Sequence, residues 1–225
     1  TMVLHSVTMV TIAPSEDKTE AAVNYLAENT EYVHKNRVER AADYLQTLGQ
    51  EETLEDYYTL AAMQIAREEY APALESIEKC IALYNNEGKD LYLDLLFKRG
   101  CLLVMLGRYD EALKSLDLAL AEDPGLADVY LIKAQIYAER QDMEALAVCL
   151  TAYLHMRPED NQIRALLAQV QFAEGDYEGA AEQYEEIMQK DPSAEIEYLY
   201  GLNAVRNYDF AAGEAALSSA IAKDD

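Results

Sequence analysis

The residues that most often act as nucleophiles, general bases or metal ligands are few in this sequence, and they stand far apart. They are His5, His34, His155, Cys80, Cys101 and Cys149. The sequence has no Cys-x-x-Cys or His-x-x-x-His pair, no nucleophile elbow and no glycine-rich phosphate loop. We therefore predict that the chain is not an enzyme and that it holds no metal and no cofactor.

Two pairs of carboxylates could in principle share acid–base chemistry, Glu51-Glu52 and Glu185-Glu186. Adjacent residues on a helix point to different sides of it, so neither pair can act as a dyad. The 17 tyrosines fall mostly at helical core spacings, and core packing is the interpretation that they favour.

The cysteines also bear on the compartment. Two of the three lie inside apolar helical stretches, which predicts buried thiols without a disulfide. Reduced thiols are typical of a reducing compartment, so the sequence favours the cytoplasm. A removed signal sequence or lipid anchor stays open as an alternative. No run approaches the ~20 apolar residues that a membrane-spanning helix needs, so we predict no membrane span.

The charge of the chain limits its partners. Eighteen basic residues stand against 42 acidic ones, which gives a net charge of −24. Nucleic acids and anionic membranes are bound through Lys and Arg, so this composition argues against both. A partner attracted by charge should be basic. The alternative is that the acidic surface only keeps the protein soluble.

The elements that must position any site repeat at a fixed interval. Three sets of residues recur 34 positions apart. They are Gly100, Ala134 and Ala168; Tyr109, Met143 and Tyr177; and Pro124, Pro158 and Pro192. A period in this range predicts a stack of similar two-helix units, each of which buries its apolar faces against its neighbours.

Each repeated position predicts a structural role. The small residue of the first set allows the two helices of a unit to cross closely. Gly107 and Gly175 stand where a left-handed residue would end the first helix. Asp142 and Asp176 follow as N-caps of the second helix. The prolines end the second helix, because proline disfavours helical geometry in the residue before it.

The period divides the chain into a terminal segment and six units. Residues 1–19 are expected to be flexible or extended. Residues 85–90 hold five residues more than the period allows, which predicts either a longer loop or an extra helical turn. The units are expected near residues 20–53, 54–92, 93–126, 127–160, 161–193 and 194–225.

Two stretches, Arg99–Pro124 and Leu167–Pro192, resemble tetratricopeptide repeats in their small residue, Gly-x-Tyr turn, alanine and final proline. The resemblance extends over about six units. It implies an all-α fold, a right-handed superhelical solenoid of antiparallel helix pairs. It also implies binding of peptides or protein domains in a concave groove lined by the first helices. The tryptophan that the family often places at position 4 is replaced here by Leu96, Tyr130 or Arg164.

The same resemblance implies which residues line the groove, namely those at positions 2, 5, 9 and 12 of each first helix. The candidates are Tyr58, Asp94, Phe97, Cys101, Asp128, Leu131, Gln135, Gln169, Phe172 and Tyr198. Position 2 is acidic in four units of five, with Glu55, Asp94, Asp128, Gln162 and Glu195. These acids could form a ladder that binds Lys or Arg. Alternatively, they only stabilise the helix N-termini.

We predict a non-catalytic scaffold that binds a protein or peptide segment, basic with apolar anchors. Tetratricopeptide co-chaperones bind the C-terminus of heat-shock chaperones with Lys, Asn and Arg. The groove rows argue against that partner, because they contain no Asn and only Lys98 is basic. Two alternatives stay open: a substrate-recruiting or regulatory region of a larger enzyme or secretion machine, and a chaperone for exported proteins.

Overall fold

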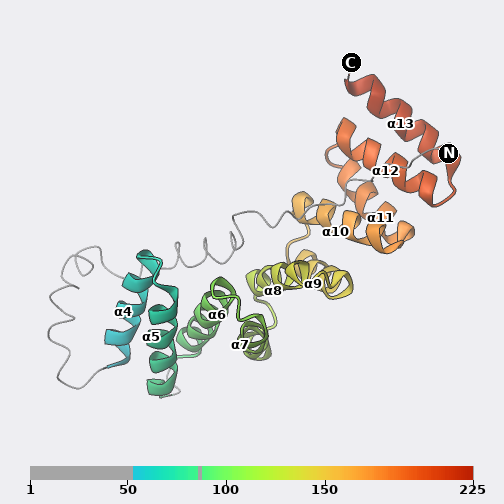
Figure 1. The fold of residues 1–225 in the computed structure, drawn as a ribbon. Helices are drawn as coiled ribbons and strands as arrows, with labels where there is room; N and C mark the ends of the chain where they lie inside the picture. Colours follow the sequence, from blue (N-terminus) through green and yellow to red (C-terminus); the bar gives the residue numbers. More distant parts are fainter. Residues whose placement is uncertain (1–52, 86–87, 225) are drawn as a thin grey trace. The chain divides into compact units, whose positions relative to one another are not determined.

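The computed structural model describes residues 53–85 and 88–224, and all regular elements in these residues are α-helices (Figure 1). This confirms the all-α prediction. The segment 1–19 and, apart from Thr53, the unit expected over 20–53 lie outside the described residues. The helices are α4 (Leu54–Ala66), α5 (Tyr70–Leu83), α6 (Lys89–Met105), α7 (Tyr109–Glu122), α8 (Ala127–Glu139), α9 (Met143–Met156), α10 (Asn161–Glu174), α11 (Tyr177–Met188), α12 (Ala194–Arg206) and α13 (Phe210–Asp224).

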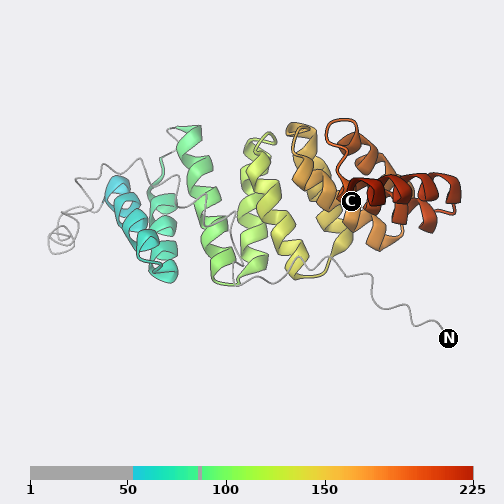
Figure 2. The same ribbon diagram turned by 90° about the horizontal axis from the view of Figure 1, so that it is seen from above.

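The helices follow each other as pairs, with α4, α6, α8, α10 and α12 as first helices and the next helix as the second. The chain divides into two compact units, whose described parts are residues 53–85 with 88–136, and residues 137–224. We call them the α4–α8 unit and the α9–α13 unit. Within them, the strongest packing joins the two helices of a pair, as for α6 with α7 and α12 with α13 (Figure 2).

In the part of the chain that the structure describes, every turn between a first and a second helix contains one left-handed residue. These residues are Glu68 (φ 59°), Gly107 (φ 71°), Gln141 (φ 57°), Gly175 (φ 83°) and Tyr208 (φ 63°). In all five turns, the N–H of the next residue donates to the carbonyl five positions back, at 2.8–2.9 Å. This hydrogen bond satisfies a carbonyl that the end of the helix would leave unpaired. The predictions for Gly107 and Gly175 are confirmed.

The left-handed turns give opposite expectations for two substitutions. Gly175→Ala should destabilise the α9–α13 unit by about 1 kcal/mol, because alanine is strained at this φ. The added Cβ would meet nothing within 4 Å, so the effect is conformational alone. Gln141→Gly should stabilise the unit by about 0.5 kcal/mol, because it removes that strain. Urea unfolding measures both changes. Equal signs for the two variants would contradict the assignment of strain to the turns.

The ends of the helices also follow the predictions. Asp142 accepts a hydrogen bond from the N–H of Ala145 at 3.1 Å, and Asp176 accepts one from the N–H of Gly179 at 3.0 Å. Both aspartates are therefore N-caps. Second helices α7, α9 and α11 end two to four residues before the repeated prolines, as expected.

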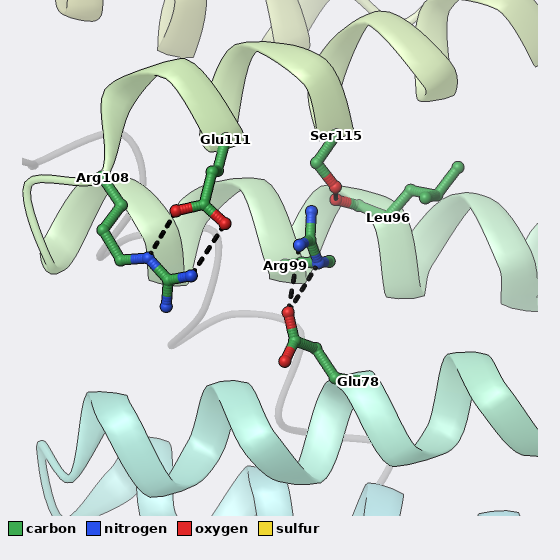
Figure 3. A network of polar contacts seen from close by, with 6 residues as sticks. All are labelled: Glu78, Leu96, Arg99, Arg108, Glu111 and Ser115. Atoms are coloured by element: carbon green, nitrogen blue, oxygen red, sulfur yellow. Dashed lines mark hydrogen bonds and ion pairs between the residues drawn. The ribbon is translucent and has the colours of Figure 1, made fainter.

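The crossing of α6 and α7 confirms the role predicted for the small residue. A Cβ atom on Gly100 would lie 2.6 Å from Cδ2 of Leu116, which is fully buried. Beside this contact, the hydroxyl of Ser115 donates to the carbonyl of Leu96 at 2.9 Å (Figure 3). The two backbones thus approach closely only because position 100 has no side chain.

Two arginine–carboxylate pairs lie on the surface of the α4–α8 unit, and one of them joins neighbouring helices (Figure 3). Arg99 on α6 donates from Nε and Nη2 to Glu78 on α5, at 3.1 and 3.0 Å. Arg108 makes a similar two-point contact with Glu111 at the start of α7. The carboxylates of both pairs are exposed, so the two pairs contribute little to the stability of the fold.

The extra residues before the third unit lengthen its first helix. Helix α6 has 17 residues, whereas α8 has 13 and α10 has 14. It begins at Lys89, about one turn before the start expected from the period. The Nζ of Lys89 donates to the carbonyl of Glu122 at 2.6 Å, and the rings of Tyr84 and Tyr92 stack with centroids 4.9 Å apart. The extra turn, one of the two alternatives, is therefore present.

The α9–α13 unit is organised in the same way. Ala168, Ala180 and Tyr184 are buried together, and residues of α12 pack against them. A Cβ atom on Gly201 would lie 2.8 Å from Cγ of Leu217, so a small residue again sets the crossing of α12 and α13. The buried Asn203 donates from Nδ2 to the carbonyl of Tyr177 at 2.8 Å, which fixes α12 on α11.

Candidate protein-binding face

Among the first helices that the structure describes, α12 has the largest exposed apolar side chains, along one side. Tyr198 is 50% exposed and Val205 is 38% exposed, and the half-buried Leu202 stands between them. Their spacing of four and three residues puts all three on one side of the helix. The buried residues of α12, which include Gly201 and Asn203, occupy the other side.

Helix α10 contributes to the same surface. Its residues Gln169 and Phe172 are half-buried. The guanidinium carbon of Arg206, on α12, lies 6.0 Å from the ring centroid of Phe172, so the two helices meet at this ring. Phe172 also packs edge-on against Tyr177, with centroids 5.5 Å apart. We call the surface formed by Gln169, Phe172, Tyr198, Leu202 and Val205 the open face.

The candidates in the α4–α8 unit form a different arrangement. The hydroxyl of Tyr58, on α4, donates to Oδ2 of Asp94, on α6, at 2.8 Å. The ammonium of Lys98 pairs with Oδ1 of the same carboxylate and lies 5.3 Å from the ring centroid of Tyr58. Lys98 is only 2% exposed. The charge of Asp94 is therefore balanced inside the protein.

Phe97 and Cys101 differ from the expectation that they line a groove. Both belong to the buried core of the α4–α8 unit, at 5% and 0% exposure. Ten of the 17 residues of α6 are buried, so this helix packs on most of its circumference. In this structure, neither side chain offers a surface to a partner.

All three cysteines are buried thiols, as predicted. Burial raises the pKa of Cys80 to about 12. Burial also raises the pKa of Cys101, while the nearby Lys98 acts in the opposite direction. Thiols of this kind react slowly because the reactive thiolate is disfavoured.

The remaining candidates and the acidic row are divided between the two units. On α8, Asp128 is exposed while Leu131 and Gln135 are half-buried. Glu55, Asp94 and Asp128 belong to the α4–α8 unit, whereas Gln162 and Glu195 are exposed residues of the α9–α13 unit. Within the residues that the structure covers, no group of three or more His, Cys, Asp or Glu could hold a metal, and no helix could span a membrane.

Comparison with known proteins identifies the repeats. A family model described as "Tetratricopeptide repeat" matches residues 103–170. This stretch, which runs from α6 to α10, consists of tetratricopeptide repeats. Proteins of this family typically mediate protein–protein interactions and are generally non-catalytic. No curated protein sequence matches the chain.

Solved tetratricopeptide structures share the solenoid fold of antiparallel helix pairs. "MamA 41-end from Desulfovibrio magneticus RS-1" is 18% identical over 78% of this chain and 97% of that chain, with a TM-score of 0.57. "Crystal structure of MamA protein" is 17% identical over 77% and 92%, with a TM-score of 0.59. YrrB, described as "a TPR protein with an unusual peptide-binding site", is 18% identical over 74% and 84%, with a TM-score of 0.57. At these identities the likeness shows the fold.

We did not identify from the sequence three residues that belong to the open face or border it, Leu202, Val205 and Arg206. Leu202 and Val205 lie 33 positions after Gln169 and Phe172, so the tetratricopeptide register could have revealed them. Counted from residue 194, where the last unit was expected to begin, they stand at positions 9 and 12 of its first helix. The position of Arg206 over Phe172 has no signal in the sequence.

The tetratricopeptide repeats also contain a polar cavity of about 430 Å³ in the α9–α13 unit. The guanidinium of Arg164 donates there to Oε1 of Gln183 at 3.0 Å, and to the carbonyl of Pro158 at 2.8 Å. The cavity is lined by Arg164, Glu182, Gln183, Glu185, Glu186 and Gln189. It has no apolar anchor point, so the open face is better suited to hold an apolar side chain.

Proposed function

We propose that the chain is a non-catalytic scaffold that binds a segment of another protein on the open face of α10 and α12. The observation that carries this proposal is the exposed row of Tyr198 and Val205 beside Phe172. Exposed aromatic side chains that stand on a rigid helix are typical anchors of protein interfaces, because little conformational entropy is lost when they bind. The peptide-binding site described for the tetratricopeptide protein YrrB supports this use of the fold.

The chemistry of the partner follows from the surface and from the charge. The apolar row requires apolar anchors in the bound segment, at the spacing of a helix or of an extended strand. The net charge of −24 attracts Lys and Arg over a distance. The exposed Glu195 stands three residues before Tyr198 on α12 and is therefore close to it on the helix surface. In the α4–α8 unit, we assign the same role to Asp128, Leu131 and Gln135.

The experiment starts from a displayed library of random peptides selected on the full 225-residue chain. Affinities of the selected peptides are then measured by fluorescence anisotropy. Tyr198→Ala should weaken binding about tenfold, because it removes the central aromatic anchor. Raising the salt concentration should weaken binding further if the peptides are basic.

The matched control is Leu118→Ala, on α7 of the other unit. Leu118 is 53% exposed, close to the 50% of Tyr198, but it lies on a second helix. Its substitution should leave the affinity unchanged. Equal affinities for the wild type and Tyr198→Ala would overturn the assignment of the open face.

A further inference from the structure

One buried position of the repeat changes from apolar to polar on the helix that carries the largest part of the open face. This position is the tenth residue of each unit, counted from the starts expected from the period. It is occupied by Met63, Leu102, Ile136, Val170 and Asn203, and each of these residues is at most 4% exposed. A buried asparagine costs free energy, in contrast to an aliphatic residue, unless its amide is fully hydrogen-bonded.

The amide of Asn203 is hydrogen-bonded on one side only. Its Nδ2 donates to the carbonyl of Tyr177, at the start of α11, at 2.8 Å. A carbonyl can only accept, so the nitrogen of the amide must face it. The amide oxygen Oδ1 is buried as well, and it has no hydrogen-bond partner among the residues that the structure describes. Asparagine therefore lowers stability at this position, compared with an aliphatic residue that packs equally well.

The hydrogen bond of Asn203 gives the contact between α12 and α11 a direction that apolar packing lacks. Ile196, Leu199 and Tyr200 of α12 pack against the buried cluster of α10 and α11. Apolar contacts are not directional, so they tolerate small shifts of one helix along another. A hydrogen bond to one backbone carbonyl forms in one register only. A single buried asparagine selects the register of coiled-coil helices in this way, at a cost in stability.

The register of α12 also determines the geometry of the open face. The guanidinium carbon of Arg206, on α12, lies 6.0 Å from the ring centroid of Phe172, on α10. The ring of Phe172 packs against the ring of Tyr177, the residue whose carbonyl accepts from Asn203. A slide of α12 by the rise of one residue, about 1.5 Å, would change these distances. The two helices of the face are thus connected through Tyr177.

We propose that Asn203 is a positioning residue for the open face. Its hydrogen bond to the carbonyl of Tyr177 holds α12 in one register, and this register sets the exposed apolar row of α12 beside Phe172. Asn203 is fully buried, so it acts through α12 and does not touch a partner. Only the expected effect on binding rests on the proposed function, since the register itself can be measured without a partner.

Asn203→Val tests the cost in stability, because it introduces the residue that α10 has at this position, Val170. The variant loses the hydrogen bond and also the buried oxygen without a partner. The carbonyl of Tyr177 stays within the hydrogen-bond pattern of α11. We expect a midpoint of urea unfolding equal to or higher than that of the wild type. Asn203→Leu provides a second apolar variant of a different shape. A lower midpoint for both variants would overturn the proposal, because Asn203 would then be an ordinary stabilising contact.

The register of α12 can be followed by fluorine NMR at Phe172. The chain has three phenylalanines, so labelling with fluorinated phenylalanine gives signals from Phe97, Phe172 and Phe210. We expect one narrow line for Phe172 in the wild type. In Asn203→Val, this line should broaden or split, because α12 is no longer held in one register. The line of Phe97, in the α4–α8 unit, should stay unchanged. An identical line of Phe172 in both proteins would contradict the proposal.

The matched control is Tyr200→Phe. It removes another hydrogen bond between the same two helices, from the hydroxyl of Tyr200 to Oε1 of Glu185 at 3.1 Å, but this bond is exposed. Exposed groups exchange a lost hydrogen bond for one to water, so α12 should keep its register. The line of Phe172 and the affinity for peptides should both stay unchanged.

The affinity for the peptides selected on the full chain completes the test. Asn203→Val should weaken binding about tenfold although it does not lower the unfolding midpoint. A purely structural role of Asn203 would lower stability and affinity together. If the line of Phe172 changes and the affinity does not, the role of Asn203 in the register is supported and binding on the open face is contradicted. The two proposals can therefore fail separately.

Discussion

Lys98→Met is expected to lower the free energy of unfolding of the α4–α8 unit by about 3 kcal/mol. The side chain of Lys98 is 2% exposed, and that of its partner Asp94 is 22% exposed. Removing the ammonium would leave a partly buried carboxylate without the charge that balances it. The hydroxyl of Tyr58 would still donate to this carboxylate, but one neutral hydrogen bond replaces an ion pair only in part. Urea unfolding followed by circular dichroism measures the change.

A second variant separates the loss of charge from the loss of packing. Asp94→Asn combined with Lys98→Met removes both charges and should recover most of the stability, because a buried pair is expensive mainly when one member is missing. The control is Lys133→Met, since the partner of Lys133 is Asp117, whose side chain is 59% exposed. That substitution should change stability by less than about 1 kcal/mol. A single Lys98→Met variant as stable as the wild type would show that the ion pair contributes nothing.

Gly100→Leu is expected to have a similarly large effect, a loss of about 3 kcal/mol. Even a single Cβ at this position would lie 2.6 Å from Cδ2 and 2.9 Å from Cγ of Leu116, so α6 and α7 would have to separate. Leucine is a better helix former than glycine by almost 1 kcal/mol, so local propensity alone predicts the opposite sign. The sign of the measured change therefore distinguishes the helix crossing from propensity.

The contact with Leu116 can be tested directly. Leu116→Ala opens space at the crossing and should reduce the additional effect of Gly100→Leu, which a double-mutant cycle measures. The control is Ala121→Leu, at an exposed position of α7, which should change stability by no more than about 0.5 kcal/mol. Additive effects of Gly100→Leu and Leu116→Ala would contradict the crossing.

The fold was largely predictable because its determinants are local and recur at a fixed interval. Gly100, Asp142 and Asp176 have the roles that their residue types and positions suggest. The left-handed residues Gln141 and Tyr208 were not predicted from their types, because neither residue favours that conformation. The left-handed conformation is imposed by the hydrogen bond that closes the turn. This bond joins two backbone groups, so it forms at the same place in every described unit whatever the side chain.

The candidate site was less predictable, because exposure depends on packing that a repeat register does not describe. Position 5 of a first helix is Phe97 in one unit and Tyr198 in another, but the first is 5% exposed and the second 50%. Burial of Lys98 also runs against the usual preference of lysine for the surface. The available signal was Asp94, four residues earlier on the same helix, since that spacing allows an ion pair.

The hydrogen bonds that close the five turns have a consequence for the kinetics of folding. Each bond joins residues five positions apart, so a helix pair can acquire its hairpin geometry before distant parts of the chain are present. Chains dominated by such short-range contacts fold fast, because little loop entropy is lost before contacts form. A helix pair of this protein can therefore begin to fold while the remainder of the chain is still being synthesised.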